Sequence, residues 1–347
     1  MKLGIHLGYW SAGPPEHAQE IVRAADDLGF DAIYSAEAYG SDALTPLAWW
    51  GASTKRIRLG TNVIQLSART PTATAMAAMT LDHLSGGRFI LGLGVSGPQV
   101  VEGWYGQRYP KPLARTREYI DIVRRTIARE VVTSAGPHYP LPLTDGGTGL
   151  GKPLRSTLHP YRTDLPIFLG AEGPKNVALA AEIADGWLPL FFSPRTDEFY
   201  RAALAEGFAQ PGARRTATDF EVHASVPVVI ADDVAGAADL IRRNLALYVG
   251  GMGARGQNFH LDVFVRMGWE DVCAQVQDLY LEGRKDEAAA AIPMEMVDDV
   301  ALVGPAARVR EQFSRWETTV VTSLLVQGVT YWPDPVRGLR TLAEALR

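Results

Sequence analysis

The stretch "RFILGLGVSGP", residues 88–98, decides between two α/β folds. Its glycines, Gly92, Gly94 and Gly97, spell G-x-G-x-x-G directly after a strand-like run. This is the spacing of the Rossmann dinucleotide fingerprint. The same letters also describe a glycine-rich loop whose successive N–H groups bind some other anion. The elements on either side of the stretch distinguish the two interpretations.

Eight strand-like runs alternate with helical patterns along the chain. The predicted strands are residues 3–10, 31–37, 57–66, 88–96, 165–171, 186–192, 220–231 and 320–328. The predicted helices are residues 15–30, 45–55, 70–87, 113–130, 174–184, 194–207, 233–249, 304–317 and 336–346. Runs such as "IFLGA" and "VVIA" are apolar throughout, which is typical of parallel strands buried on both faces. The eightfold alternation predicts a closed (β/α)8 barrel of the α/β class, because a doubly wound sheet usually has fewer strands.

The Rossmann interpretation needs three further features, and the sequence predicts that each is missing. The fingerprint should open the first βα unit, lead directly into a helix, and precede by about 20 residues an acidic residue at a strand end. Here three βα units come first, and Pro98 with the following "WYGQRYP" is expected to interrupt any helix. Arg117 and Glu118, about 20 residues on, lie inside a helical pattern. The stretch instead ends the fourth barrel strand, at the face where barrel enzymes build their active sites.

A second glycine-rich loop, "LGAEGPKN" at residues 169–176, follows the fifth predicted strand. Gly173 and Pro174 stand at the start of the next predicted helix. Proline suits the first helical position, where the free N–H groups around it face an anion with the helix dipole behind them. Taken alone, this loop is an ordinary βα turn. Two such loops after adjacent strands, on the same face of the barrel, predict one shared phosphate site.

Two long segments interrupt the βα alternation. Residues 131–164, after the helix at 113–130, are rich in Gly, Pro and Thr and are predicted to be an inserted loop. Residues 250–297, after the helix at 233–249, are predicted to be a second insertion. A (β/α)8 barrel runs to about 250 residues and more with insertions. We therefore expect one domain over residues 1–347, with both insertions roofing the barrel mouth.

Composition excludes several other classes of protein. The chain has 34 basic and 39 acidic residues, a net charge of −5 and no basic block, so nucleic acid is not an expected partner. No apolar run approaches the ~20 residues of a membrane span. The N-terminal segment is too short and too broken by glycine for the apolar region of a signal peptide. The single cysteine, Cys273, cannot form an internal disulfide, so we expect a cytoplasmic protein with no membrane partner.

Several motifs together resemble the luciferase-like oxidoreductases, which use flavin or its 5-deazaflavin analogue, coenzyme F420. These motifs are "GIHLGYW", "GFDAIYSAE", "RIRLGTNVIQLSARTP", "TLDHLSGGRFILGLG", "GAEGPKNVALAAEIADGW" and "ALVGPAARVREQF". They span nearly the whole chain, and "LDHLSGGRFILGLG" is highly characteristic of that superfamily. "GVSGPQVVEGWYG" and "LYLEGRKDEAAAAIP" look more like its actinobacterial F420-dependent branch. The resemblance implies a TIM barrel with coenzyme F420 as its cofactor, or FMN as the alternative.

The resemblance also implies where the cofactor lies. Its tricyclic ring would lean on a bulge with a non-prolyl cis peptide bond after the third strand, which is Asn62–Val63 in this chain. The phosphate of its tail would lie near Ser96 and Gly97 and near the second loop. The residues of that loop are Gly170, Ala171, Glu172, Gly173 and Pro174. These places agree with the two glycine-rich loops found from the residues themselves.

One position departs from the family pattern. Members that oxidise sugar phosphates carry "SDH" at the end of the second strand, with the Asp beside the deazaflavin and the His as catalytic base. This chain has "AEA" there, so the acid is kept as Glu37 and the base is lost, which favours a reductase. His6 and Tyr9, near the end of the first strand, are the other catalytic candidates. His6 could touch the ring or donate a proton and Tyr9 could line the pocket, while packing roles are equally open for both.

The predicted function is F420-dependent hydride transfer to a small organic substrate that the sequence does not identify. One alternative is an FMN-dependent monooxygenase on the same barrel, and another is a barrel that binds flavin without catalysis. The sequence contains no H-E-x-x-H motif, no paired cysteines and no nucleophile elbow, so neither a metal nor a serine hydrolase is predicted. The resemblance further implies a homodimer in which the first helices pair.

Overall fold

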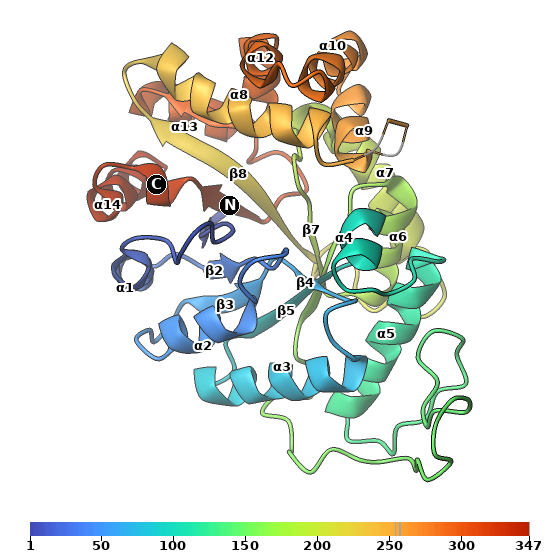
Figure 1. The fold of residues 1–347 in the computed structure, drawn as a ribbon. Coiled ribbons are helices and arrows are strands. Elements are labelled where there is room, and N and C mark those ends of the chain that lie inside the picture. Colours follow the sequence, from blue (N-terminus) through green and yellow to red (C-terminus); the bar gives the residue numbers. More distant parts are fainter. Residues whose placement is uncertain (254, 257, 347) are drawn as a thin grey trace.

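Eight parallel strands close into a barrel in the computed structural model, which describes residues 1–346 except 254 and 257 (Figure 1). In ring order these strands are β1 (Lys2–His6), β2 (Ala32–Ser35), β3 (Arg58–Thr61), β5 (Phe89–Gly94), β6 (Ile167–Gly170), β7 (Gly186–Leu188), β8 (Glu221–Ile230) and β10 (Ser323–Gln327). The last strand closes the ring, since Leu324 lies opposite Leu3 of β1 on one side and Ala224 of β8 on the other. The predicted (β/α)8 barrel is confirmed.

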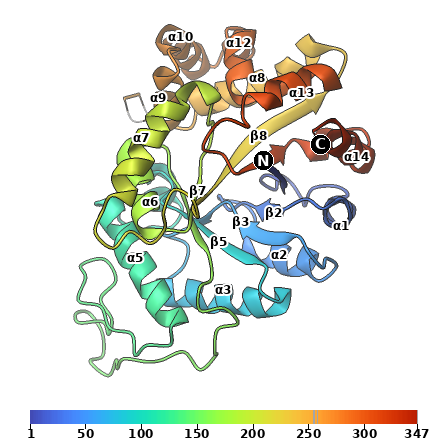
Figure 2. The same ribbon diagram turned by 180° about the vertical axis from the view of Figure 1, so that it is seen from behind.

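Helices cover the outside of the ring (Figures 1 and 2). They are α1 (Ala18–Leu28), α2 (Leu44–Gly51), α3 (Pro71–Ser85), α5 (Pro112–Ile127), α6 (Pro174–Ile183), α7 (Asp197–Phe208), α8 (Val234–Gly250), α13 (Ala306–Ser314) and α14 (Pro335–Ala345). Side chains alternate along each strand between two cores. Tyr34 and Phe168 pack inside the ring, whereas their neighbours Ile33, Ile167 and Leu169 pack in the outer core beneath the helices.

Local signals fix the ends of α3, which the sequence places at residues 70–87. The Thr70 side chain accepts a hydrogen bond from the Ala73 N–H and Pro71 takes the first helical position. Gly86 ends the helix in the left-handed conformation, with φ 65°. Each residue type has the role it prefers at a helix end, so the observed bounds agree closely with the prediction.

The predicted strand 57–66 is two short strands. β3 ends at Thr61 and β4 (Ile64–Gln65) follows, and both pair with β5. Between them, Asn62 and Val63 form a bulge joined by a cis peptide bond. The Asn62 N–H donates a hydrogen bond of 2.7 Å to the Ser35 carbonyl oxygen. The bulge that the family resemblance implies is therefore present, at the carboxyl end of the barrel strands.

Two other strands end earlier than predicted. The first was expected to reach Trp10, but β1 ends at His6 because Gly8 adopts φ 75° and its N–H donates to His6 Nδ1. The sixth was expected to reach Phe192, but β7 ends at Leu188. Phe191 has φ 57°, in the left-handed region that an extended strand excludes.

The expectation that Pro98 interrupts any helix is wrong. Pro98 is the first residue of a short helix, α4 (Pro98–Gly103), and Gly97 precedes it in an extended conformation. The first helical position lacks an intrahelical N–H partner in any case, so proline is tolerated there. One of the three features used against a Rossmann turn is therefore present, and the closed ring excludes that fold on its own.

The two segments predicted as insertions differ in structure. Residues 131–164 are irregular, and the described structure shows two isolated bridges there, Val132–Leu154 and Ser134–Leu141. Residues 250–297 include residues 254 and 257, which lie outside the described residues. The helices that begin in this segment are α9 (Phe259–Arg266), α10 (Glu270–Leu281), α11 (Lys285–Ala290) and α12 (Met294–Val300), and they share a second apolar core with α8.

Two further features complete the fold. A short strand that was not predicted, β9 (Leu302–Gly304), extends the pairing of β8 outside the ring. Across the described residues, the helices include none whose length and hydropathy would allow it to span a bilayer.

Candidate active site

Glycines of β5 and β6 make room for the bulge after β3. A Cβ atom on Gly92 would lie 1.8 Å from the Thr61 carbonyl oxygen, and one on Gly94 would lie 2.5 Å from Val63 Cγ2. On β6, a Cβ atom on Gly170 would lie 3.2 Å from Val63 Cγ1. The Gly92 N–H already donates to the Thr61 hydroxyl. Gly92 and Gly94 therefore fit the bulge, and the prediction that the glycines expose N–H groups to an anion is wrong for Gly92, whose N–H is already bonded.

Beyond these glycines, β5 and β6 each lead into a loop that ends in Gly-Pro. Gly97 precedes Pro98 at the first position of α4, and Gly173 precedes Pro174 at the first position of α6. Both glycines are extended, and neither helix has a side-chain cap. Since β5 and β6 are paired neighbours, the two loops lie on the same rim of the barrel.

These loops carry backbone N–H groups that have no partner. In the part of the chain that the structure describes, the N–H groups of Ser96, Gly97, Glu172 and Gly173 make no hydrogen bond. A Cβ atom on Gly173 would meet nothing within 4 Å, so the space beside this residue is open. Unpaired N–H groups that line open space suit an anion. The geometry therefore fits the phosphate position that the sequence predicts.

The second of these loops is held from the other side by α9. Glu172 Oε1 lies 2.8 Å from His260 Nδ1, at ion-pair distance without hydrogen-bond geometry. The Glu172 carbonyl oxygen accepts from Arg266 Nη2 at 3.0 Å and from the Tyr200 hydroxyl at 3.4 Å. Glu172 Oε2 is buried without a protein partner among the described residues. An unsatisfied carboxylate oxygen beside the open loop can accept from a ligand hydroxyl.

Aromatic side chains from three elements meet nearby. Tyr248, at the end of α8, contacts the edges of Phe191 and His260, with ring centroids 5.0 Å apart in both pairs. Its hydroxyl is hydrogen-bonded to that of Tyr9, whose ring is half exposed. Burial raises the pKa of both hydroxyls above the usual value of a tyrosine. Both groups therefore keep their protons at neutral pH and can donate hydrogen bonds.

His6 supports the bulge from below. Its ring is buried, and the Gly8 N–H donates to Nδ1 at 3.1 Å, which places the ring proton on Nε2. Nε2 then donates to the Asn62 carbonyl oxygen at 3.2 Å. Burial lowers the pKa of His6 to about 4, against the opposing effect of the Asn62 hydrogen bond. At neutral pH the ring is therefore neutral, with its N–H directed at the main chain.

The lowered pKa of His6 predicts a specific loss of stability in acid. A histidine with a pKa of about 4 in the folded chain and about 6.5 in the unfolded chain is protonated preferentially on unfolding, so stability falls as the pH drops below 6.5. Between pH 7 and pH 5, we expect the wild type to lose about 2 kcal/mol more unfolding free energy than His6→Gln. Urea unfolding at each pH measures this difference. Equal losses in the two proteins would contradict it.

Glu37, the predicted acid at the end of β2, is engaged by its own neighbours. Its side chain is buried and forms an ion pair of 2.8 Å with Arg69. Oε2 also accepts from the Gln65 N–H at 3.1 Å. Arg69 thus binds Glu37 and the pair fixes the chain around β4. A catalytic or cofactor-binding role for Glu37 stays a prediction, as it does for His6 and Tyr9.

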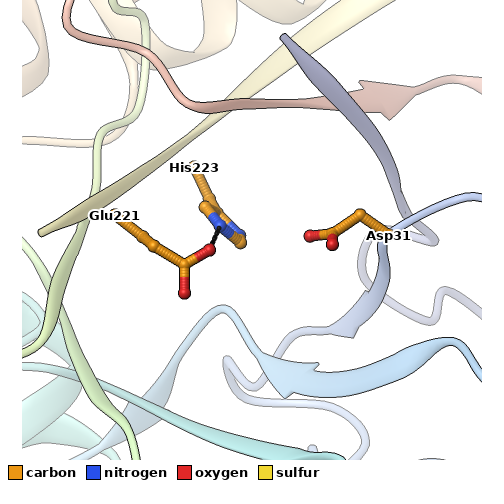
Figure 3. A group of neighbouring side chains, drawn as sticks. All are labelled: Asp31, Glu221 and His223. Atoms are coloured by element: carbon orange, nitrogen blue, oxygen red, sulfur yellow. Dashed lines mark hydrogen bonds and ion pairs between the residues drawn. The ribbon is translucent and has the colours of Figure 1, made fainter. Parts of the chain in front are cut away.

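Three side chains of metal-ligand type meet at the opposite, amino end of the strands. Figure 3 shows them as Asp31, which precedes β2, and Glu221 and His223 of β8. Arg58 donates twice to Glu221 at 2.8 Å and also pairs with Asp31, while Lys2 lies 3.3 Å from Asp31. Burial alone would raise the pKa of Glu221, but hydrogen bonds from His223 and Arg58 hold it well below the usual range. The cluster is an ion-pair network at the amino end of the barrel strands, in which the side chains of Arg58 and Lys2 supply the positive charges.

The sequence predicted the loop residues of the site and missed those that come from the second insertion. His260 and Arg266 follow Gly173 by more than 80 positions, and no spacing connects them with it. Only the packing of α9 against the loop after β6 brings them together. The segment "GGMGARGQNFH" is visible as glycine-rich, but its histidine carries no local signal of a role.

Comparison with known proteins gives consistent matches over most of the chain. The family model described as luciferase-like monooxygenase matches residues 3–323. A Mycobacterium tuberculosis protein named "Putative coenzyme F420-dependent oxidoreductase" is 66% identical over 328 residues, 94% of each chain. The 5,10-methylenetetrahydromethanopterin reductase of Archaeoglobus fulgidus is 27% identical over 340 residues, 94% of this chain and 93% of the other.

A solved structure matches the fold at low sequence identity. The coenzyme F420-dependent tetrahydromethanopterin reductase of Methanopyrus kandleri superposes with a TM-score of 0.81 at 19% identity. The match covers 100% of this chain and 99% of the other. This likeness extends the barrel assignment to the whole chain.

Proposed function

The chain belongs to the luciferase-like monooxygenase family, and on that basis we propose that it is a coenzyme F420-dependent oxidoreductase that acts as a reductase. The high identity to the mycobacterial relative supports both the enzyme class and the cofactor. The reductive direction is supported by Ala38, which stands where sugar-phosphate-oxidising members have their basic histidine. The substrate is a small organic molecule.

One observation of the structure carries the proposal. The loops after β5 and β6 lie on one rim and carry four N–H groups that are unpaired among the described residues, at Ser96, Gly97, Glu172 and Gly173. The phosphate of an F420 tail is an anion that these groups can bind together. The unpartnered Glu172 Oε2 beside them can accept from a hydroxyl of the same tail. The residues present therefore fit this cofactor.

The chain's own residues would position the reactants. Val63, held between Gly94 and Gly170, offers an apolar surface at the barrel mouth for a planar ring. When bound, the reduced deazaflavin supplies a hydride. Tyr9 and Tyr248 hold protonated hydroxyls at the mouth, which can donate hydrogen bonds to the substrate. Holding the partners in contact is the main contribution expected of the barrel.

Cofactor titration tests the proposal. Quenching of protein and cofactor fluorescence is measured with F420 and with FMN side by side. The proposal expects saturable binding of F420 that is at least tenfold tighter than that of FMN. Tighter binding of FMN would favour a flavin-dependent monooxygenase on the same barrel. Binding of neither cofactor would overturn the proposed function.

We also propose that the protein is a homodimer that pairs through α2 and α3. Trp49 on α2 and Met76 and Leu84 on α3 are 75%, 59% and 73% exposed. The other exposed residues of these two helices include no Asp, Glu, Lys or Arg. Trp49 also lines a cavity of about 540 Å³ together with Trp10 and Trp50. An exposed apolar face of this kind suits a second copy of the chain.

Light scattering tests the dimer. The wild type is expected to have the mass of two chains, and Trp49→Glu is expected to shift the equilibrium to monomer because it places a charge in the apolar face. A monomeric wild type would overturn this proposal.

We propose that the protein works in the cytoplasm, in keeping with its single, buried cysteine.

A further inference from the structure

Arg266 and His260 join the second insertion to the loop that follows β6. Both residues belong to α9, which lies beside α7 and α8 in Figures 1 and 2. Arg266 Nη2 donates to the Glu172 carbonyl oxygen at 3.0 Å, and His260 Nδ1 lies 2.8 Å from Glu172 Oε1. α9 thus contacts both the main chain and the side chain of Glu172.

The position of α9 is itself well fixed. Asn258 precedes the helix and accepts from the N–H groups of His260 and Leu261 at 3.1 Å. Its amide donates to the carbonyl oxygens of Tyr248 and Val249 at 2.9 Å. This buried side chain therefore ties the start of α9 to the end of α8.

The far end of α9 is anchored against α7. The guanidinium of Arg266 stacks over the Phe199 ring, with 5.6 Å to its centroid, and approaches the Tyr200 hydroxyl at 3.4 Å. Arg266 Nε is buried and has no partner among the described residues. The guanidinium therefore has a fixed place, with the Glu172 carbonyl oxygen as its nearest hydrogen-bond acceptor.

The grip on the Glu172 carbonyl decides where the next N–H points. The carbonyl of Glu172 and the N–H of Gly173 belong to one planar peptide unit, in which a trans bond directs them to opposite sides. Arg266 and Tyr200 hold the carbonyl on the α7–α9 side. The Gly173 N–H must then point away from α9, where no residue that the structure describes accepts from it.

We propose that Arg266 is a positioning residue for the cofactor's anionic tail, which acts by orienting the Glu172–Gly173 peptide unit, with His260 holding the Glu172 carboxylate clear of the anion. This inference rests on the proposed function and deepens it. The second insertion then has two roles, since the segment expected to roof the mouth also completes the cofactor site. Without Arg266, the peptide unit is free to turn and present its carbonyl oxygen to the phosphate.

The test compares two ligands that differ only in the tail. F420 carries the phosphate, and the deazaflavin nucleoside that lacks it shares the ring and the sugar-alcohol chain. Arg266→Met, which keeps an apolar stem and removes the donors, is expected to weaken F420 binding about tenfold and to leave nucleoside binding unchanged. Arg266→Lys, which keeps a donor, is expected to recover most of the affinity. Equal weakening of both ligands, or no weakening of either, would overturn the inference.

Two controls separate positioning from other effects. Arg201 donates to the Thr318 carbonyl oxygen at 3.0 Å, the distance at which Arg266 donates to the Glu172 carbonyl oxygen. Arg201→Met is therefore a matched change away from the site, and this variant should bind both ligands as the wild type does. If Arg266 acted only by attracting the charge of the phosphate, its removal would have little effect in about 1 M salt, because the Debye length there is ~3 Å. The inference expects the tenfold effect to persist there, and its disappearance would overturn positioning in favour of simple attraction.

A second variant keeps the test decisive if Arg266→Met does not fold. His260→Phe preserves the ring packing with Tyr248 and removes the polar contact with Glu172. It is expected to weaken F420 binding about threefold with no change for the nucleoside, and His260→Asn is expected to restore it. If the wild type binds the nucleoside as tightly as it binds F420, the phosphate tail adds no affinity and the inference is overturned. A wild type that binds neither would overturn the proposed function itself.

Discussion

Replacing Gly92 by alanine is expected to lower the free energy of unfolding by about 4 kcal/mol or more. The added Cβ atom would stand 1.8 Å from the Thr61 carbonyl oxygen and 2.8 Å from Leu188 Cδ1. The Thr61 main chain cannot retreat freely, because the threonine hydroxyl makes two hydrogen bonds of 2.8 Å to the main chain of Gly92. Urea unfolding followed by circular dichroism measures the change.

Gly103→Ala is the matched control for this substitution. Gly103 ends α4, and a Cβ atom there would meet nothing within 4 Å. Alanine is favoured over glycine in helices, so this variant should be as stable as the wild type or slightly more so. A Gly92→Ala protein with wild-type stability would show that the bulge can move away from β5. Failure of the variant to fold would agree with the prediction.

Gly173→Val is expected to weaken F420 binding about 50-fold, equivalent to about 2.3 kcal/mol. The backbone of Gly173, at φ −78° and ψ 149°, is one that valine adopts readily. The new side chain meets no protein atom at its Cβ, so it must occupy the open space beside the unpaired N–H groups. Fluorescence titration with F420 measures the loss, and thermal unfolding confirms that the fold is intact.

Gly13→Val provides the comparison for this second substitution. Gly13 lies in the loop before α1, and its Cβ position is likewise free of atoms within 4 Å. Valine there should leave F420 affinity unchanged. If Gly173→Val bound F420 as tightly as Gly13→Val does, the anion would not lie at the loop after β6.

Segments with strong local signals were predicted closely, and those decided by tertiary contacts were not. Thr70, Pro71 and Gly86 set the ends of α3 by themselves, and the sequence shows all three. The end of β1 depends instead on the ring of His6, which accepts a hydrogen bond from the N–H of Gly8. No pattern of apolar residues reveals that contact, so the predicted strand was too long.

A residue type with two opposite uses misled the prediction at Pro98. Proline ends a helix when it stands in the interior and suits the first position when it opens one. The sequence "GVSGPQVVEG" allows both, and the structure uses the second. The equivalent Gly173–Pro174 pair was interpreted correctly, because a long helical pattern follows it.

The candidate site was predicted only as far as it is built from strand ends. Ser96, Gly97, Glu172 and Gly173 follow their strands directly, so barrel geometry alone places them on one rim. The contacts made by Arg266 and His260 join segments about 90 residues apart, and chain geometry places no such constraint on them. The family resemblance supplied the bulge at Asn62–Val63, which residue patterns alone do not indicate.

The pairing of β10 with both β1 and β8 has a consequence for synthesis on the ribosome. β1 and β8 cannot pair with β10 until residues 323–327 of the 347-residue chain have been translated. Unpaired strand edges readily recruit other polypeptides. Until then a nascent chain keeps strand edges without their final partner, and we expect a chain that ends before β10 to aggregate rather than form a smaller barrel.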